Sequence, residues 1–195
     1  MVPSGGEYRR FGWPGQRWAS QLNVDPLDSG KNRMANAPTA GRPTISGGYL
    51  EPKLLAWSWA EVRLTRALNY WVASVTATGA PHVRPVWGVW LDQQFYFSSG
   101  SRIRRNVLAR SRVSVNLESG DECVIVQGLA SELHEAGAVA RVTEAYNAKY
   151  NWNVEPKAGE FFEVKPRVVF GWLCDGSGLD GGALFSQTAT RWLFE

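Results

Sequence analysis

The sequence predicts an α+β fold built on an antiparallel β-barrel, either closed or split. Many short segments rich in β-branched and aromatic residues alternate with turn sequences, which is typical of antiparallel strands. Two longer segments carry apolar residues at helical spacing. The chain has 195 residues, of which 44% are hydrophobic, so we expect one well-filled core.

The expected strands fall in the last two thirds of the chain. They are residues 70–77, 82–91, 95–99, 111–117, 123–133, 160–165, 167–173 and 189–194. Gly128 lies inside one of them and indicates a bulge or a close backbone approach. Pro166 separates the strand over 160–165 from the strand over 167–173. A glycine-rich loop over 176–182 precedes the last strand.

Two helices complete the domain. The first is expected from Ser58 to about Asn69, because Ser58 and Glu61 form a capping box, and Leu64 and Leu68 would be its buried face. The second is expected over residues 136–150. Its core-facing residues, at helical spacing, are Val139, Val142, Tyr146 and Tyr150.

An arginine-rich segment is the strongest functional signal. Five arginines fall in eleven residues without Asp or Glu; they are Arg102, Arg104, Arg105, Arg110 and Arg112. The segment follows Ser98, Ser99, Gly100 and Ser101, whose hydroxyl and amide groups suit an anion, phosphate above all. If Ser101 caps a helix, Arg102, Arg105 and Asn106 share one face while Val107 and Leu108 turn towards the core. The alternative is a solvated basic helix.

Composition excludes several function classes. The formal net charge of +3 is too mild to indicate a nucleic-acid binder. The two cysteines form no CxxC pair, and His82 and His134 lack partners at metal-ligand spacing, so we expect reduced thiols and no metal site. The chain carries no nucleophile-elbow, Walker or dinucleotide-binding motif. No apolar run is long enough for a membrane span or secretory signal, so we expect a cytoplasmic protein.

Residues 1–52 are rich in Gly, Pro, Ser and Asn and are expected to form an extended arm, with the folded domain over 53–195. Aromatic and basic residues mix near the start of this arm, which leaves contact with a partner chain or nucleic acid as an alternative role. Met34 is a second plausible start of the protein.

Several stretches together resemble a known family. They are NYWVASV, PHVRPVWGVW, SSGSR followed by RN, AYNAKYNW, RVVFGW and ATRWLFE. Over residues 53–195 the chain is similar to the pyridoxamine 5'-phosphate oxidase-like split barrels, and within them to the actinobacterial flavin- and deazaflavin-dependent oxidoreductases. The resemblance implies a homodimer that holds two cofactors in grooves at its interface and transfers hydride to or from a small organic substrate. It also implies that Trp192, in the last strand, plugs the dimer interface.

The resemblance also implies the cofactor and its binding residues. The cofactor would be the deazaflavin coenzyme F420, with FMN as the alternative. The residues that would line its ring or hold its phosphate are Arg84, Pro85, Val86, Trp87, Ser98, Ser99, Ser101, Arg102 and Arg105. Many members have lysine in an RKxRN pattern where this chain has Ile103, so the phosphate contact must fall on Arg102 or Arg104.

The preference for F420 rests on charge, because five arginines, with Lys149 nearby, exceed what one FMN phosphate requires. No catalytic residue is assigned, since the cofactor itself performs hydride transfer. Trp87 and Trp90 have an alternative role as simple packing residues of the barrel. Arg84 has an alternative role as the partner of an acidic residue on a neighbouring strand. A non-catalytic cofactor- or haem-binding barrel is the alternative function.

Overall fold

The computed structural model describes residues 37–44, 51–176 and 178–195 of the chain. The aromatic and basic residues of the predicted arm and the alternative start at Met34 lie outside these residues. Within the described part, Ala37–Glu195 forms one compact unit.

In the described residues, nine strands make one antiparallel sheet. They are β1 Thr39–Gly41, β2 Tyr70–Val75, β3 Pro81–Val86, β4 Gly88–Leu91, β5 Gln94–Ser98, β6 Arg112–Asn116, β7 Glu122–Glu132, β8 Phe161–Leu173 and β9 Thr190–Leu193. The pairing order is β1-β9-β8-β7-β6-β2-β3, and β5 joins β4 to the first half of β8. No pairing joins β3 to β4 among the described residues, so the barrel is split there and the chain crosses the split at Trp87. The predicted α+β split barrel is confirmed.

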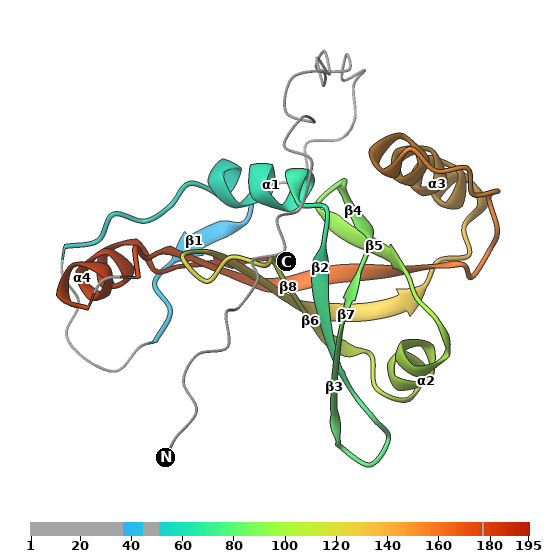
Figure 1. The fold of residues 1–195 in the computed structure, drawn as a ribbon, viewed down its shortest axis with the longest axis horizontal. Helices are drawn as coiled ribbons and strands as arrows, with labels where there is room; N and C mark the ends of the chain where they lie inside the picture. The colour runs from blue at the N-terminus through green and yellow to red at the C-terminus, as the bar shows by residue number, and fades with distance from the viewer. Residues whose placement is uncertain (1–36, 45–50, 177) are drawn as a thin grey trace, which may run out of the picture. The chain divides into compact units, whose positions relative to one another are not determined.

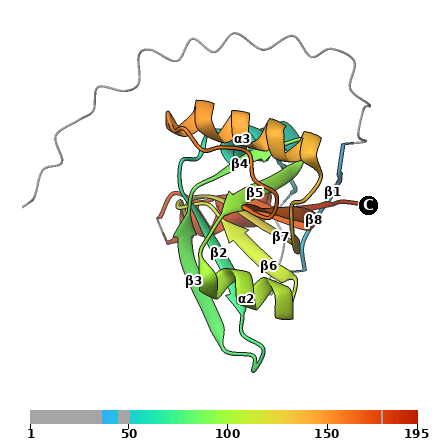
Figure 2. The same cartoon turned by 90° about the vertical axis from the view of Figure 1, so that its right-hand side faces the viewer.

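The part of the chain that the structure describes has four helices flanking the sheet: α1 Trp57–Arg66, α2 Ser101–Ala109, α3 Ala136–Tyr150 and α4 Leu179–Thr188. Figures 1 and 2 show α2 and α3 on opposite sides of the barrel strands, with α1 on the same side as α3. Two buried clusters fill the space between these layers. One lies inside the barrel beneath α1, around Phe95, Phe97 and Trp192, and the other lies beneath α3, around Tyr146 and Phe161.

The first helix differs from its prediction at both ends. It begins at Trp57 after Ala56, and no side chain caps it, so the predicted capping box of Ser58 is wrong. Ser58 lies inside the first turn because Trp57 packs against the core tryptophans Trp90 and Trp192. Leu64 is buried as predicted, whereas Leu68 lies beyond the helix end and is 59% exposed.

Two strand predictions are also corrected by long-range pairing. The predicted strand over 82–91 is two strands, since β3 pairs with β2 and β4 pairs with β5. Pro166 does not interrupt β8, because its partner position on β7 is Gly128, where the register shifts. The predicted bulge and close approach at Gly128 are both confirmed: a Cβ there would lie 2.3 Å from the Lys165 carbonyl oxygen. A bulge disrupts the ladder locally, so the missing N–H of proline is tolerated.

The glycine-rich segment after β8 becomes a helix, α4, although a loop was predicted over 176–182. Its last turn is fixed to the sheet: Thr188 Oγ1 donates to the Leu184 carbonyl and accepts from the Leu173 amide at 2.9 Å. The Phe185 ring contacts Trp172 edge to face, with centroids 5.6 Å apart. This tertiary packing outweighs the low helix propensity of Gly181 and Gly182.

The described part of the predicted arm contributes the edge strand β1, which pairs with β9. None of the helices in the described ranges is both long enough and apolar enough to cross a membrane.

Candidate functional site

A groove of about 440 Å³ lies where the split of the barrel meets the turn between β5 and α2. Four parts of the chain form it: the residue before β2, the end of β3 with the break that follows it, the β5–α2 turn, and one side chain from α3. The lining residues are Asn69, Arg84, Pro85, Val86, Trp87, Ser98, Ser99, Gly100 and Tyr146.

Six of the nine residues that the sequence predicted as cofactor ligands line this groove. They are Arg84, Pro85, Val86, Trp87, Ser98 and Ser99. Arg102 and Arg105 are exposed on α2 and do not line it, and the side chain of Ser101 is outside the described atoms. The role of all nine as cofactor ligands stays a prediction.

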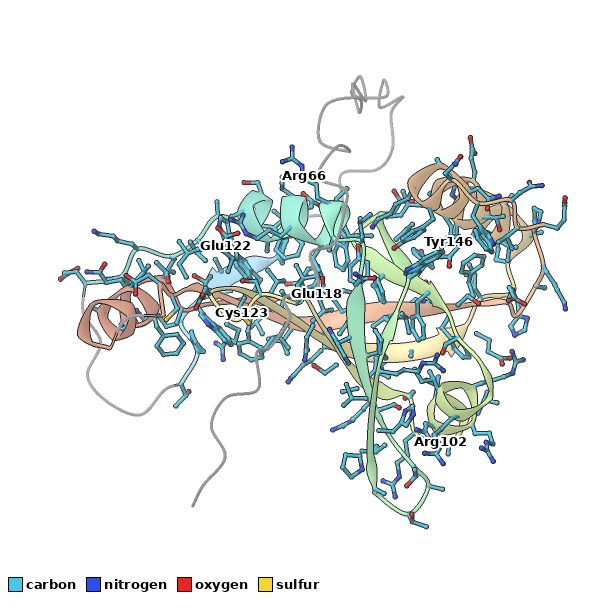
Figure 3. All side chains as sticks on the ribbon, viewed as in Figure 1. Arg66, Arg102, Glu118, Glu122, Cys123 and Tyr146 are labelled. Atoms are coloured by element: carbon cyan, nitrogen blue, oxygen red, sulfur yellow. The ribbon has the colours of Figure 1, made fainter. Side chains whose placement is uncertain are left out.

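Sequence reasoning missed Asn69 and Tyr146 as lining residues. Tyr146 was expected only in the core, and it does pack there, against Phe161 at a centroid distance of 5.2 Å. Its place on the fourth turn of α3 brings part of its ring to the groove as well, and Figure 3 shows it between α3 and the sheet. Asn69 carried no signal, because its position follows from where β2 starts.

The β5–α2 turn offers polar groups that the protein leaves unused. Ser98 Oγ donates to Glu160 Oε1 at 3.2 Å, but the buried Ser99 Oγ has no hydrogen-bond partner among the described residues. Gly100 precedes α2 without any side-chain cap, and the first turn of α2 contains no acidic residue. An uncapped helix N-terminus beside a free hydroxyl is a suitable environment for an anion.

The arginines of α2 divide into two groups. Arg104 donates to the Gly159 carbonyl at 3.0 Å and pairs with Glu132, and Arg110 donates to the Ala77 carbonyl at 3.0 Å. These two therefore brace loops. Arg102 and Arg105 form no ion pair or hydrogen bond within the described part of the chain, and neither does Arg84 in the groove. The alternative pairing of Arg84 with an acid is thus not seen there.

The predicted face of α2 is partly wrong. Asn106 does not share the exposed basic face: it is 4% exposed, and its Nδ2 donates to Ser74 Oγ on β2 at 3.0 Å. Ile103 is fully buried beside it, which explains why an apolar residue occupies this position, and Val107 is buried as predicted. Leu108, expected in the core, is 65% exposed because it lies on the opposite face.

Trp87 forms one wall of the groove. Its ring stacks on Tyr150, with centroids 4.7 Å apart and planes inclined by 3°, and meets Trp152 edge to face at 5.9 Å. The ring remains 42% exposed, so it is not simply barrel packing, whereas Trp90, at 7%, is. Trp192 is also fully buried inside the chain, so its predicted place at a subunit interface is wrong.

The end of α3 is bonded to the residue after Trp87. Tyr150 Oη accepts from the Gly88 amide at 2.8 Å, and Lys149 Nζ donates to the Gly88 carbonyl at 3.0 Å and to Tyr70 Oη at 2.7 Å. Burial lowers the pKa of the Lys149 ammonium from 10.5 to about 8. Burial also raises the pKa of Tyr150 to about 12, and that of Tyr70 well above its ordinary value.

The comparison with known families decides the relationship. Residues 61–173 match the family model described as pyridoxamine 5'-phosphate oxidase, which is more than half of the chain. The chain belongs to the pyridoxamine 5'-phosphate oxidase family. No curated protein matches its sequence significantly.

Two solved structures share the fold of this pyridoxamine 5'-phosphate oxidase family member. A conserved hypothetical protein of Mycobacterium tuberculosis has a TM-score of 0.53 and 16% identity, over 65% of this chain and 94% of its own. HupZ of group A Streptococcus has a TM-score of 0.50 and 15% identity, over 60% and 94%. A protein described as an F420 reductase is 24% identical, with a TM-score of 0.45, over 56% and 94%.

This family member has a second, larger hollow on the outer face of the barrel. The cavity measures about 720 Å³ and is crossed by β2, β3, β6, β7 and β8. Apolar side chains such as Ala73, Val75 and Val83 form much of its lining, and Arg112 and Arg167 flank them. Val83 is 53% exposed there, so this sheet face is uncovered in the single chain.

Proposed function

We propose that this protein is an oxidoreductase that binds a flavin-type cofactor in the groove and transfers hydride between it and a small organic substrate. One observation supports the proposal above the rest. The fold brings two separate sequence motifs, PHVRPVW and SSG, together around one groove that joins an aromatic wall to an uncapped helix N-terminus. A flavin needs both, because its planar ring and its phosphate lie at opposite ends of the molecule.

The residues present fit such a group. Ser99 Oγ and the first amides of α2 would hold the phosphate, with Arg84, Arg102 and Arg105 supplying charge. Trp87 and Tyr146 would contact the ring and keep water from it. When bound, the cofactor supplies the hydride chemistry, so this chain has only to bind and orient it.

We propose coenzyme F420 as the cofactor, with FMN as the alternative. Fewer arginines are available to bind the cofactor than the sequence suggested, because Arg104 and Arg110 donate hydrogen bonds to backbone carbonyls of this chain. The preference for F420 rests instead on Arg102 and Arg105, which form no ion pair or hydrogen bond in the described part of the chain. F420 carries carboxylates beyond its phosphodiester, and these exposed guanidinium groups would bind them.

We propose further that the active form is a homodimer. The uncovered outer face of the barrel is a broad, largely apolar surface on five strands, of the kind that a second protein surface covers. The resemblance to the split barrels supports a second copy of this chain as that surface.

The experiment that tests the cofactor is a titration of the purified protein with FMN and with F420, followed by absorbance and fluorescence. We expect F420 to bind more tightly, and added salt to weaken its binding, since exposed charges are screened over about 10 Å at 0.1 M. Equal affinities or a preference for FMN would overturn the choice of F420, and no binding of either would overturn the proposed function. Sedimentation velocity tests the dimer, and a monomer at micromolar concentration would contradict it.

A further inference from the structure

Tyr150 lies behind the aromatic wall of the groove and contacts both of the aromatic residues that line it. Its ring is stacked on Trp87 at 4.7 Å and lies 4.8 Å from the ring of Tyr146, inclined by 49°. Tyr150 does not itself line the groove. It therefore supports the wall without belonging to the binding surface.

The residue next to Trp87 is held at both of its backbone groups. The Gly88 N–H donates to Tyr150 Oη, and the Gly88 carbonyl lies 2.8 Å from the same hydroxyl and 3.0 Å from Lys149 Nζ. Its other side is closed too, since a Cβ on Gly88 would lie 2.4 Å from the ring of Phe95. The backbone that carries Trp87 thus has little freedom to shift.

Lys149 binds the Gly88 carbonyl without an acidic residue beside it in the described part of the chain. Its Nζ donates to Tyr70 Oη at 2.7 Å and lies 4.9 Å and 5.5 Å from the ring centroids of Tyr70 and Tyr150. No carboxylate pairs with it within the described ranges. Placing an ammonium group here is unfavourable compared with water, so its retention suggests a role in the contacts that it makes.

We propose that Lys149 and Tyr150 are positioning residues that fix Trp87 as a rigid wall, and that this wall selects a planar ring system as the ligand of the groove. The identity of that ligand rests on the proposed function; the positioning itself does not. A half-exposed tryptophan held rigidly loses little conformational freedom on binding, which favours flat ligands that stack or slide against it.

Fluorine NMR tests the positioning without any ligand. The full chain is labelled with 5-fluorotryptophan, and the Trp87 resonance is assigned from the variant Trp87→Phe. In Tyr150→Phe the ring remains but the hydroxyl is lost, so we expect the Trp87 resonance to shift and broaden while the resonances of Trp90 and Trp192 stay unchanged. The matched control is Tyr96→Phe, which removes a buried hydroxyl bonded only to Gln94. An unchanged Trp87 resonance in Tyr150→Phe would overturn the proposal.

A pH titration of the same spectra separates positioning from a purely structural effect. The titratable groups that face Lys149 are Tyr70 from β2 and Tyr150 from α3, and both keep their protons well above pH 8. We expect the wild-type Trp87 resonance to move with a midpoint near pH 8, and no such step in Lys149→Met. The same midpoint in the variant would contradict the role of Lys149. If Lys149→Met does not fold, the Tyr150→Phe spectra still decide.

Ligand binding supplies the second arm. We expect Tyr150→Phe to weaken FMN and F420 binding by roughly 2- to 10-fold, which is the scale of a single net hydrogen bond, because the hydroxyl that holds the backbone next to Trp87 is lost. Tyr96→Phe should leave the binding of both cofactors unchanged. Full affinity in Tyr150→Phe would overturn the selective role of the wall. If the wild-type protein binds neither cofactor, the proposed function fails, while the fluorine spectra still test the positioning.

Discussion

The two sides of the groove are built on opposite principles. On the wall side, the Gly88 backbone is bonded to Lys149 and Tyr150, and the Trp87 ring is stacked on Tyr150. On the turn side, the buried Ser99 Oγ has no partner among the residues that the structure describes, and no side chain there caps α2. The difference teaches that the wall is complete in the single chain, whereas the turn carries hydrogen-bonding capacity that an external anion would use.

The largest expected effect is a difference in stability between two glycine variants, one on each side of the groove. Gly88→Ala should lower the free energy of unfolding by about 1–3 kcal/mol or more, because its Cβ would lie 2.4 Å from Phe95 and 2.6 Å from the Tyr96 carbonyl oxygen. Gly100→Ala should change it by less than about 0.5 kcal/mol, since no atom lies within 4 Å. Urea denaturation of both variants measures the difference, and equal values would break the comparison.

The next effect concerns charge on the turn side. Arg102→Ala should weaken cofactor binding by about 1.5–3 kcal/mol with no loss of stability, because this guanidinium has no partner in the described chain. Arg84→Ala, inside the groove, should do the same. Arg112→Ala is the control, since it lies outside the groove and should matter less. Calorimetric titration alongside thermal unfolding measures both quantities; normal affinity in the folded Arg102 and Arg84 variants would remove the anion site.

A smaller effect is expected at the unpartnered hydroxyl. Ser99→Ala should leave stability unchanged or slightly higher, because it removes a buried polar atom that has no hydrogen bond. The same variant should weaken cofactor binding by about 0.5–1.5 kcal/mol. Thermal unfolding with and without cofactor measures both. A clear loss of stability without cofactor would mean that the hydroxyl is already satisfied.

The smallest effect is a pH dependence on the wall side. Between its folded pKa of about 8 and its ordinary value of 10.5, Lys149 binds more protons in the unfolded chain than in the folded one. The free energy of unfolding should therefore rise as the pH increases from about 8 to 9. Cys123, whose pKa burial raises from 9.0 to about 11, opposes this rise increasingly as the pH approaches 9.0. Urea denaturation across this range should show the rise in wild type and not in Lys149→Met.

Local sequence signals predicted what depends on nearby residues. The bounds of α3 follow from helical spacing over 136–150, and the bulge at Gly128 follows from a glycine inside a strand pattern. The six groove residues were predicted because they lie in two continuous motifs, PHVRPVW and SSG, which resemble a family.

Other features depend on contacts between distant segments, which no local pattern carries. The barrel splits at Trp87 because β3 and β4 pair with different strands. Arg104 pairs with Glu132 and Asn106 donates to Ser74, and both partners are far away in the sequence. The sequence of α2 therefore could not show which of its polar residues bind within the chain and which stay exposed. Helix α4 was missed because its contacts with Trp172 and Leu173 outweigh its two glycines.

The short strand β1 has a practical consequence for where the chain can be cut. Its three residues pair with β9, where Gly41 lies opposite Arg191 and Thr39 lies opposite Leu193. Strand β1 therefore covers one edge of the longest run of paired strands in the sheet. A chain that starts after residue 36 keeps this cover, whereas one that starts at residue 42 exposes the backbone of β9. Bare edges of this kind recruit strands from other molecules. We therefore expect a chain that lacks residues 37–41 to aggregate more readily than one that keeps them, as measured by light scattering.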